Sequence, residues 1–261
     1  MTGIDGRDAA RAPGARPADV PGSGARVLAR DSVRKASRPP SPADAATVSR
    51  AVAALLPAAG LSGSTRVSCF TPGTMIATPR GAVAVERLKP GDMVITRDNG
   101  PQEIRWAGRQ HLAGAPLRLD TRLQPVTIRA GALGPGVPER DLQLSPNHRV
   151  LLLGDHPSLD VAEAEVFVSA RHLIGTRGIE RTTVTETCYL HFMCDRHEVV
   201  LSNGAWTESF QPSVDAMQGV SQRAREELFA LFPELAATGP KERFGTARPI
   251  FGAQAVRRIR A

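Results

Sequence analysis

Between Thr74 and Ser202 the chain consists of short apolar or β-branched runs separated by turn-forming residues, and this pattern limits the fold more than any other feature. Such runs, with turn signals at regular spacing, are typical of an all-β domain. The runs are TMIAT, AVAVE, DMVITR, PQEIRW, PVTIR, DLQLS, VLLL, EVFVSA, TTVTET, CYLHFM and HEVVLS, and the turn signals are Gly81, Pro90-Gly91-Asp92, Asp98-Asn99-Gly100 and Asn203-Gly204. We therefore predict an all-β fold class with a hairpin at Asn203-Gly204, because Asn-Gly favours the two-residue turn that joins adjacent strands.

The two ends of the chain differ from this middle part in charge. The formal net charge of +7 divides into +5 over residues 1–68, −1 over residues 69–213 and +3 over residues 214–261. Basic charge on the flanks alone does not form the Lys/Arg-rich face of a nucleic-acid-binding domain. We therefore expect no nucleic-acid partner, and we expect three parts: a basic N-terminal segment, a β domain and a basic C-terminal tail.

The flanking parts have different structural expectations. Residues 1–43 contain few large aliphatic side chains, so we expect residues 1–68 to be largely disordered, with one short amphipathic helix at residues 45–61. In the tail, apolar residues recur at mostly three- and four-residue spacings over 214–235, which predicts an amphipathic helix. The final GAQAVRRIRA predicts a second, short and basic helix.

Compartment and membrane signals are sparse. The first thirty residues lack the apolar run of a secretory signal, and the apolar run at 45–61 is too short to span a bilayer. The three cysteines, Cys69, Cys188 and Cys194, are an odd number without framework spacing, so nothing demands an oxidising compartment. The default expectation is a cytoplasmic chain without a membrane span, and export without such a signal stays open.

Three segments carry candidate chemistry. The first is SCFTPGT, which contains Cys69, and the second is LSPNHR, which contains Ser145 and His148. The third, YLHFMCDRHEVVLSNGAWTES, contains His197 and the Asn203-Gly204 pair. In this order and at this spacing they resemble the Hint family, which Hedgehog autoprocessing domains and inteins share, and most of all the bacterial intein-like Hint proteins.

The resemblance covers residues 69 to about 213. CFTPGT is similar to the start of the family, where a cysteine follows the scissile bond. LSPNHRV is similar to the family's T-x-x-H motif, with Ser145 where threonine is usual, and the third segment is similar to the end of an intein domain. The resemblance implies a horseshoe-like β domain with pseudo-two-fold symmetry.

Cysteine chemistry explains why these residue types are needed. The Cys69 thiol is covalently adjacent to the Ser68 carbonyl, so its attack forms a thioester with the high effective concentration of an intramolecular reaction. His148 suits a general acid for the leaving amine, Ser145 suits a group that polarises or twists the same peptide, and His197 is a candidate assistant to Cys69. The expected activity is single-turnover autoproteolysis, with no cofactor or metal.

The expected partners follow from this chemistry. The N-terminal segment, residues 1–68, is the substrate of the cleavage, and water, a thiol or an amine is the acceptor of the thioester. Without their neighbours, these residues have plain structural interpretations that stay open: Cys69 as a small buried hydrophobe, His148 as a residue at the start of a strand, and Ser145 as a turn former.

A zinc site is one interpretation of the spacing of four residue types that bind zinc, since cysteine and histidine recur at every third position: Cys188, His191, Cys194 and His197. On a strand, that spacing places the two cysteines on one face and the two histidines on the other. A single tetrahedral site would therefore need a bulge or a loop. We expect strand residues rather than a metal site.

Two departures from the family narrow the expected reaction. Asn203-Gly204 is an internal turn, while Glu208 and Ser209 occupy the places of an intein's final histidine and asparagine, so we expect no full splicing. The region after Trp106 has no clear match for the Hedgehog aspartate that activates cholesterol, so sterol transfer is not expected. A basic, mostly disordered segment is an odd cargo to release, which leaves a non-cleaving Hint-shaped interaction module as the alternative.

Overall fold

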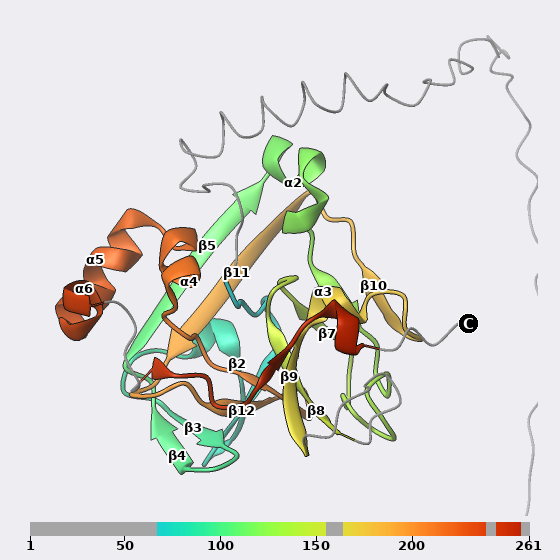
Figure 1. Ribbon diagram of the computed structural model, residues 1–261, viewed down its shortest axis with the longest axis horizontal. Helices are drawn as coiled ribbons and strands as arrows, with labels where there is room; N and C mark the ends of the chain where they lie inside the picture. The colour runs from blue at the N-terminus through green and yellow to red at the C-terminus, as the bar shows by residue number, and fades with distance from the viewer. Residues whose placement is uncertain (1–66, 155–163, 239–243, 257–261) are drawn as a thin grey trace, which may run out of the picture. The chain divides into compact units, whose positions relative to one another are not determined.

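The computed structural model describes residues 67–154, 164–238 and 244–256. The predicted disorder before Val67 and the predicted helix at 45–61 lie outside these ranges. Within them, the fold consists mainly of β-strands with a few short helices, which confirms the all-β prediction (Figure 1). No helix in the described part of the chain is long and apolar enough to cross a membrane.

Within the described residues the strands form one large sheet, one small sheet and one ribbon (Figure 1). The large sheet runs in the order β14 (Ile250–Phe251), β9 (Glu165–Ser169), β8 (Arg149–Leu153), β13 (Ala205–Glu208), β12 (Val199–Ser202), β1 (Met75–Thr78) and β2 (Gly81–Ala84), and β3 (Met93–Thr96) joins it at β12 and pairs with β4 (Gly100–Glu103). The small sheet runs in the order β10 (Ile179–Arg181), β6 (Val126–Ile128) and β7 (Leu142–Leu144). The ribbon pairs β5 (Trp106–Ala113) with β11 (Glu186–Met193).

The hairpin between β12 and β13 has the predicted turn. Asn203 and Gly204 both have positive φ angles, 47° and 80°, as a two-residue turn between twisted strands requires. The Asn203 side chain also ties this turn to its surroundings, since its Oδ1 accepts from the Met75 N–H at 2.8 Å and its Nδ2 donates to the Asp141 carbonyl at 2.9 Å. Asn203 therefore has a structural role that accounts for its side chain.

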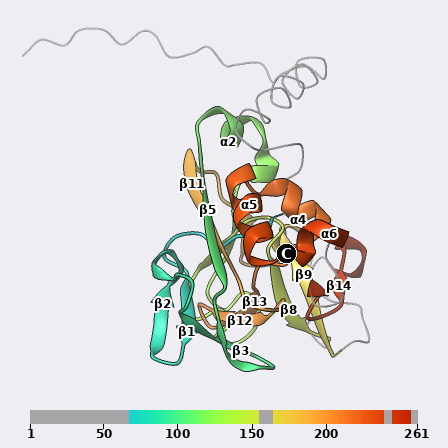
Figure 2. The same ribbon diagram turned by 90° about the vertical axis from the view of Figure 1, so that its left-hand side faces the viewer.

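The strands differ from the sequence prediction in two places. Of the run TTVTET, only Glu186 and Thr187 lie in a strand, β11. The preceding residues 182–185 are outside it, and there the Gln124 side chain satisfies the Val184 backbone in place of a neighbouring strand: Oε1 accepts from the Val184 N–H at 2.7 Å and Nε2 donates to its carbonyl at 3.1 Å. Conversely, β5 continues through polar residues that carried no strand signal. This strand pairs with β11 along its whole length, and that pairing holds it extended although its sequence has no alternating pattern (Figures 1 and 2).

The C-terminal part differs from the expected two helices. The helix predicted over 214–235 is broken into α4 (Val214–Gly219), α5 (Gln222–Leu231) and α6 (Glu234–Thr238). Ser221 starts α5 by accepting the Ala224 N–H, and Pro233 separates α5 from α6. Of the second expected helix, residues 252–261, the described part forms a short 3-10 turn at Ala253–Ala255 directly after β14, and residues 257–261 lie outside the described ranges.

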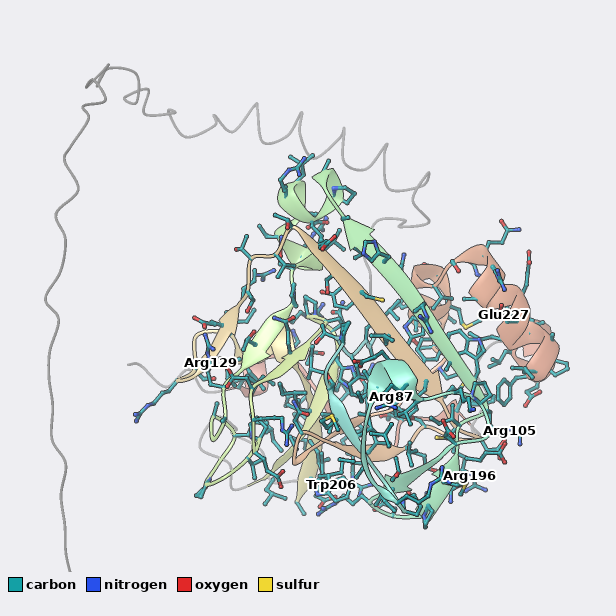
Figure 3. The ribbon with its side chains drawn as sticks, turned by 180° about the vertical axis from the view of Figure 1, so that it is seen from behind. Arg87, Arg105, Arg129, Arg196, Trp206 and Glu227 are labelled. Carbon is teal, nitrogen blue, oxygen red and sulfur yellow. The ribbon has the colours of Figure 1, made fainter. Side chains whose placement is uncertain are left out.

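The helices α4 to α6 lie against the β5–β11 ribbon (Figure 2). Their apolar residues Met217, Leu228 and Phe232 share a buried cluster with Trp106 and Cys69. Trp106 also donates from Nε1 to Glu227 Oε2 at 3.3 Å, and Figure 3 places Glu227 on the helix beside this ribbon. The remaining short helices are α2 (Ala115–Leu119), α3 (Ala170–Leu173), and the 3-10 turns Val85–Arg87 and Thr121–Leu123.

The chain around Cys69 passes between two buried cores. Phe70 packs in the larger cluster with Leu144, Leu190 and Phe192, whereas the neighbouring Cys69 packs in the second cluster. Successive side chains of an extended segment point to opposite sides, which explains the division. Cys69 therefore faces the ribbon and the C-terminal helices.

Candidate functional site

The segment that contains Cys69 is held on both sides by backbone hydrogen bonds. Phe70 exchanges two with Leu190 of β11, at 2.7 and 2.9 Å, and the Cys69 carbonyl accepts one from the Ser145 N–H, just after β7, at 2.9 Å. Cys69 is only 3% exposed and Ser68 only 8% exposed. The peptide bond between them is buried and fixed in place.

Ser145 spans this peptide. Its Oγ accepts the Cys69 N–H at 2.9 Å and donates to the Val67 carbonyl at 2.9 Å. The turn that follows β7 sets this position, since the His148 N–H donates to the Ser145 carbonyl at 3.0 Å. Ser145 therefore contacts the nitrogen that would leave if the Ser68–Cys69 bond broke.

The Cys69 sulfur faces His191 of β11. The distance from Sγ to His191 Nδ1 is 3.5 Å. The His191 ring stacks on Trp106, with ring centroids 5.1 Å apart and planes 16° apart, and it lies 5.4 Å from the Phe210 ring. Burial lowers the pKa of His191 to about 4 and raises the pKa of the Cys69 thiol above its usual range. At neutral pH the pair is therefore a neutral thiol beside a neutral imidazole.

His148 is buried in the same region without hydrogen bonds to its ring. Neither ring nitrogen has a hydrogen-bond partner among the described residues, and the ring packs 4.4 Å from the Phe70 ring. Burial lowers the pKa of His148 to about 4, against the opposing influence of the Glu208 carboxylate. A buried polar group without a partner costs free energy, and such groups are rare in folded proteins. The Cys69 backbone nevertheless lies near enough to raise the pKa of His148 in part, so His148 is a donor or acceptor beside Cys69 without a well-formed hydrogen bond.

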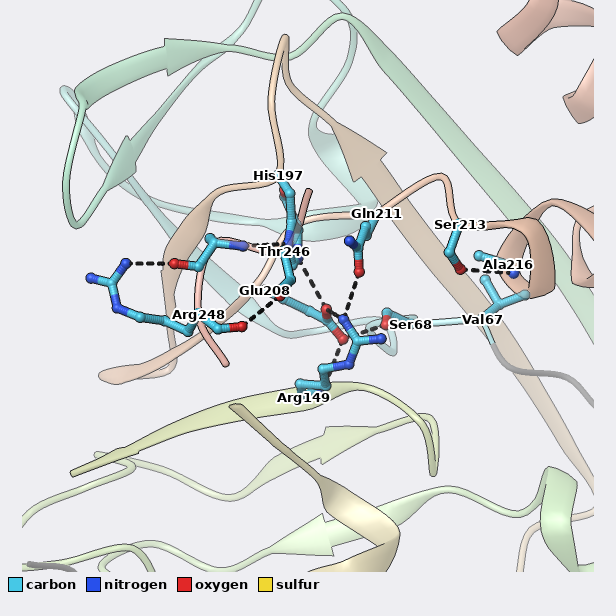
Figure 4. A network of polar contacts seen from close by, with 12 residues as sticks. Val67, Ser68, Arg149, His197, Glu208, Gln211, Ser213, Ala216, Thr246 and Arg248 are labelled. Atoms are coloured by element: carbon cyan, nitrogen blue, oxygen red, sulfur yellow. Dashed lines mark hydrogen bonds and ion pairs between the residues drawn. The ribbon is translucent and has the colours of Figure 1, made fainter. Parts of the chain in front are cut away.

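Glu208 is the buried charge of the site (Figure 4). Its Oε1 accepts from the Ser68 hydroxyl and from the Arg149 N–H at 2.8 Å, and its Oε2 accepts from Arg149 Nη1 at 2.9 Å and from His197 Nε2 at 3.0 Å. Burial alone would raise the pKa of Glu208, but Arg149 and His197 hold it at about 2. Glu208 is therefore ionised and fully hydrogen-bonded.

The structure places His197 on Glu208, with both of its ring nitrogens engaged away from the Cys69 sulfur. The Ala247 N–H donates to His197 Nδ1 at 3.0 Å, so in this tautomer the ring proton is on Nε2, which faces Glu208. The histidine at the sulfur is His191 instead. Of the residues that the sequence predicted, Cys69, Ser145 and His148 lie together. His197 does not contact Ser68 directly; both residues donate to the Glu208 carboxylate.

Two residues of the site were not assigned a role from the sequence. His191 was considered only within the repeated Cys/His spacing, and Glu208 only as a departure from the intein ending. The four residues of that Cys/His spacing are separated: β11 ends at Met193, Cys194 is buried in the larger core, and His197 follows a turn. Among the described residues, no group of three or more His, Cys, Asp or Glu side chains lies together as a metal site would need.

Little free volume lies beside Cys69. A cavity of about 10 Å³ is present there. It is lined by Val67, Cys69, Gln110, Leu112, Leu123, Ser145, Pro146 and Tyr189. This is roughly the space of a single water molecule, so a larger acceptor would need the site to open.

Two of the buried histidines, His148 and His191, predict a pH-dependent stability. Because the pKa values of His148 and His191 are about 4 in the folded protein and 6.5 ordinarily, the unfolded chain takes up these protons first as the pH falls. The free energy of unfolding should therefore fall between pH 7 and pH 5, by on the order of 2 kcal/mol for each histidine. Urea unfolding at both pH values measures this.

A matched pair of variants assigns the effect. His191→Phe should remove about half of the loss caused by His148 and His191, since one of these two imidazoles is then absent. His111→Phe, at an exposed position of the same ribbon, should keep all of it. An equal pH dependence in both variants would contradict the neutral, buried state of His191.

Comparisons with known proteins agree with these observations. The family model described as "Hint domain" matches residues 68–214. Similar solved structures include the bacterial intein-like domain from Clostridium thermocellum (17% identity, TM-score 0.36, 54% of this chain and 97% of that chain) and the gp41-1 intein (12% identity, TM-score 0.31, 54% and 97%). A third is the Ssp DnaB mini-intein variant M86 (14% identity, TM-score 0.34, 55% and 94%). No curated protein matches the chain. Because the family model covers more than half of the sequence, the chain belongs to the Hint domain family.

Proposed function

We propose that this Hint domain breaks its own Ser68–Cys69 peptide bond through a thioester, and that the product is N-terminal cleavage rather than splicing. One observation carries the proposal: Ser145 and His191 contact the two atoms of Cys69 between which the acyl group would move. Ser145 Oγ lies 2.9 Å from the nitrogen, and His191 Nδ1 lies 3.5 Å from the sulfur. An arrangement that only packed the cysteine would need neither contact.

The first step is an exchange of bonds with no net proton change. His191 Nδ1 takes the proton from the Cys69 thiol as Sγ bonds to the Ser68 carbonyl carbon. The Ser68 C–N bond then breaks, and the Cys69 nitrogen takes up a proton to become an amine. We assign this second proton transfer to neutral His148, whose ring nitrogens have no other hydrogen-bond partner in the described structure. One ring nitrogen gives its proton to the leaving amine while the other takes up the proton released by the thiol, so both histidines end the step neutral.

The second step transfers the Ser68 acyl group to an external acceptor. Water, a thiol or an amine attacks the thioester carbonyl, the C–S bond breaks and the Cys69 thiol is restored. The small cavity beside Cys69 favours compact acceptors. No splicing step is proposed, because the Asn203 side chain is held by Met75 and Asp141 within a hairpin turn.

The direct test is incubation of the purified full chain with hydroxylamine, a compact nucleophile that resolves thioesters. Mass spectrometry should show one fragment ending in a hydroxamate of Ser68 and one beginning at Cys69. A chain that stays intact would overturn the proposal. It would favour the alternative, a non-cleaving Hint-shaped module, which is supported by the closure of Cys69 from solvent.

Ser145→Ala should slow this cleavage about tenfold to a hundredfold. The substitution removes the oxygen at the leaving nitrogen and leaves the buried Cys69 N–H and Val67 carbonyl without that partner, a loss of ~1–3 kcal/mol for each unsatisfied group. Ser145→Thr keeps the hydroxyl and should keep most of the rate. Fragment yield against time, together with thermal unfolding of each variant, separates slow chemistry from lost stability. Equal rates in Ser145→Ala and wild type would exclude a role for the hydroxyl.

A further inference from the structure

The side chain of Ser68 has no part in the bond exchange, yet it is held in a buried polar site. Ser68 lies directly before the scissile bond, and its hydroxyl donates to Glu208 Oε1. Arg149 donates to both carboxylate oxygens and His197 donates to Oε2, so four hydrogen bonds surround the carboxylate. One of these four comes from the residue to be released.

The C-terminal strap, defined as residues 244–251, completes this site. The Ala247 N–H fixes the tautomer of His197, which in turn donates to Glu208. Arg248 anchors the strap through Glu165 and Asp98, each at 2.7 Å. The strap lies beyond residue 214, where the match to the family model ends. The recognition of Ser68 is therefore partly built by residues outside the matched domain.

We propose that Glu208 is a specificity-determining residue that selects a short hydroxyl side chain at the position before the scissile bond. The inference rests on the cleavage proposed above and goes further, because it defines which N-terminal segments are good substrates. A hydroxyl donates to the carboxylate and fixes the side-chain rotamer, which orients the adjacent carbonyl toward the Cys69 sulfur. An apolar side chain would leave one acceptor position unfilled, and an acidic one would place two negative charges together in a buried site.

Two pairs of near-isosteric substitutions test these two effects separately. Ser68→Thr keeps the hydroxyl and Ser68→Val removes it at the same size, so Val should be cleaved at least about tenfold more slowly than Thr. Ser68→Asn is neutral and Ser68→Asp is charged at the same size, so Asp should be cleaved at least about tenfold more slowly than Asn. Hydroxylamine cleavage of the full chain at neutral pH gives the rates.

The charge effect should depend on Glu208. In a Glu208→Gln background the difference in cleavage rate between Asn and Asp at position 68 should largely disappear, because a neutral amide then replaces the opposing carboxylate. Equal rates within both pairs in the wild-type background would overturn the inference. If the rate difference between Asn and Asp persists unchanged in Glu208→Gln, a group other than Glu208 causes it. If Glu208→Gln does not fold, the two pairs at position 68 still decide the matter.

Failure of the cleavage proposal gives a different pattern. If the wild-type chain and all four variants stay intact in hydroxylamine, cleavage is overturned, and the contact is then measured without it. In a Cys69→Ala background, thermal unfolding should still rank Thr above Val and Asn above Asp at position 68. Identical melting temperatures within both pairs would show that Glu208 recognises nothing at this position.

Discussion

Cys69→Ala is expected to stay intact under conditions in which the wild-type chain releases residues 1–68. Alanine has no nucleophile next to the Ser68 carbonyl, and in the described structure no other cysteine contacts that bond: Cys194 is buried in the larger core, and Cys188 points to the side of Phe70 and Leu190. Cleavage should fall below detection rather than by a graded factor, because every later step needs the thioester. Mass spectrometry after incubation with hydroxylamine measures the outcome.

Cys188→Ala is the matched control for this experiment. Cys188 is a half-buried thiol of β11, on the opposite side of the strand from His191. Its removal should leave the fragment yield at the wild-type level. If both variants lose cleavage, the loss in Cys69→Ala cannot be assigned to the position of Cys69 next to the scissile bond. Cleavage that persists in Cys69→Ala would exclude the thioester altogether.

His191→Phe is expected to slow cleavage by about a hundredfold or more, the usual size of the effect when a positioned acid–base group is lost. Because burial raises the pKa of the Cys69 thiol, little thiolate forms at neutral pH, and attack depends on transfer of the proton to a neighbouring base. His191 Nδ1 is within 3.5 Å of the sulfur, and burial keeps it unprotonated. Without it, no other base contacts the thiol among the described residues.

The stability of the His191→Phe variant distinguishes the proposed catalytic role of His191 from a role in packing. Phenylalanine keeps an aromatic ring beside Trp106 and Phe210 but is larger than imidazole in a closely packed place against Gly108, so the variant should fold with a loss of stability of at most about 1–3 kcal/mol at neutral pH. His111→Phe, in the same ribbon but exposed, should be cleaved like the wild type. A His191→Phe variant that is both folded and fully active would reduce His191 to a core residue.

Sequence-local features of this protein could be predicted from the sequence. Alternating apolar runs and turn residues specify an all-β domain because strands and tight turns depend on near neighbours. The Asn203-Gly204 turn follows from the few residues that tolerate positive φ. Ser145 and His148 lie in one turn, and Cys69 is covalently adjacent to the bond that we propose it breaks, so two short motifs were enough to predict that these three residues lie together.

Residues far apart in the chain required the tertiary structure. His191 reaches Cys69 because Phe70 pairs with Leu190, and Glu208 reaches Ser68 across 140 positions because β13 pairs with β8. The strand β5 is ordered by its pairing with β11, while residues 182–185 of the run TTVTET do not form the predicted strand and Val184 bonds to the Gln124 side chain instead.

The sequence by itself determined the fold class and pointed to Cys69 as the proposed nucleophile beside the bond it is proposed to break, because covalent adjacency and turn chemistry are local properties. Only the tertiary structure decided which histidine faces the sulfur and which carboxylate holds the preceding residue. It also decided the protonation states. Burial, which no single segment specifies, keeps the His191 and His148 imidazoles neutral, while Arg149 and His197 keep Glu208 ionised.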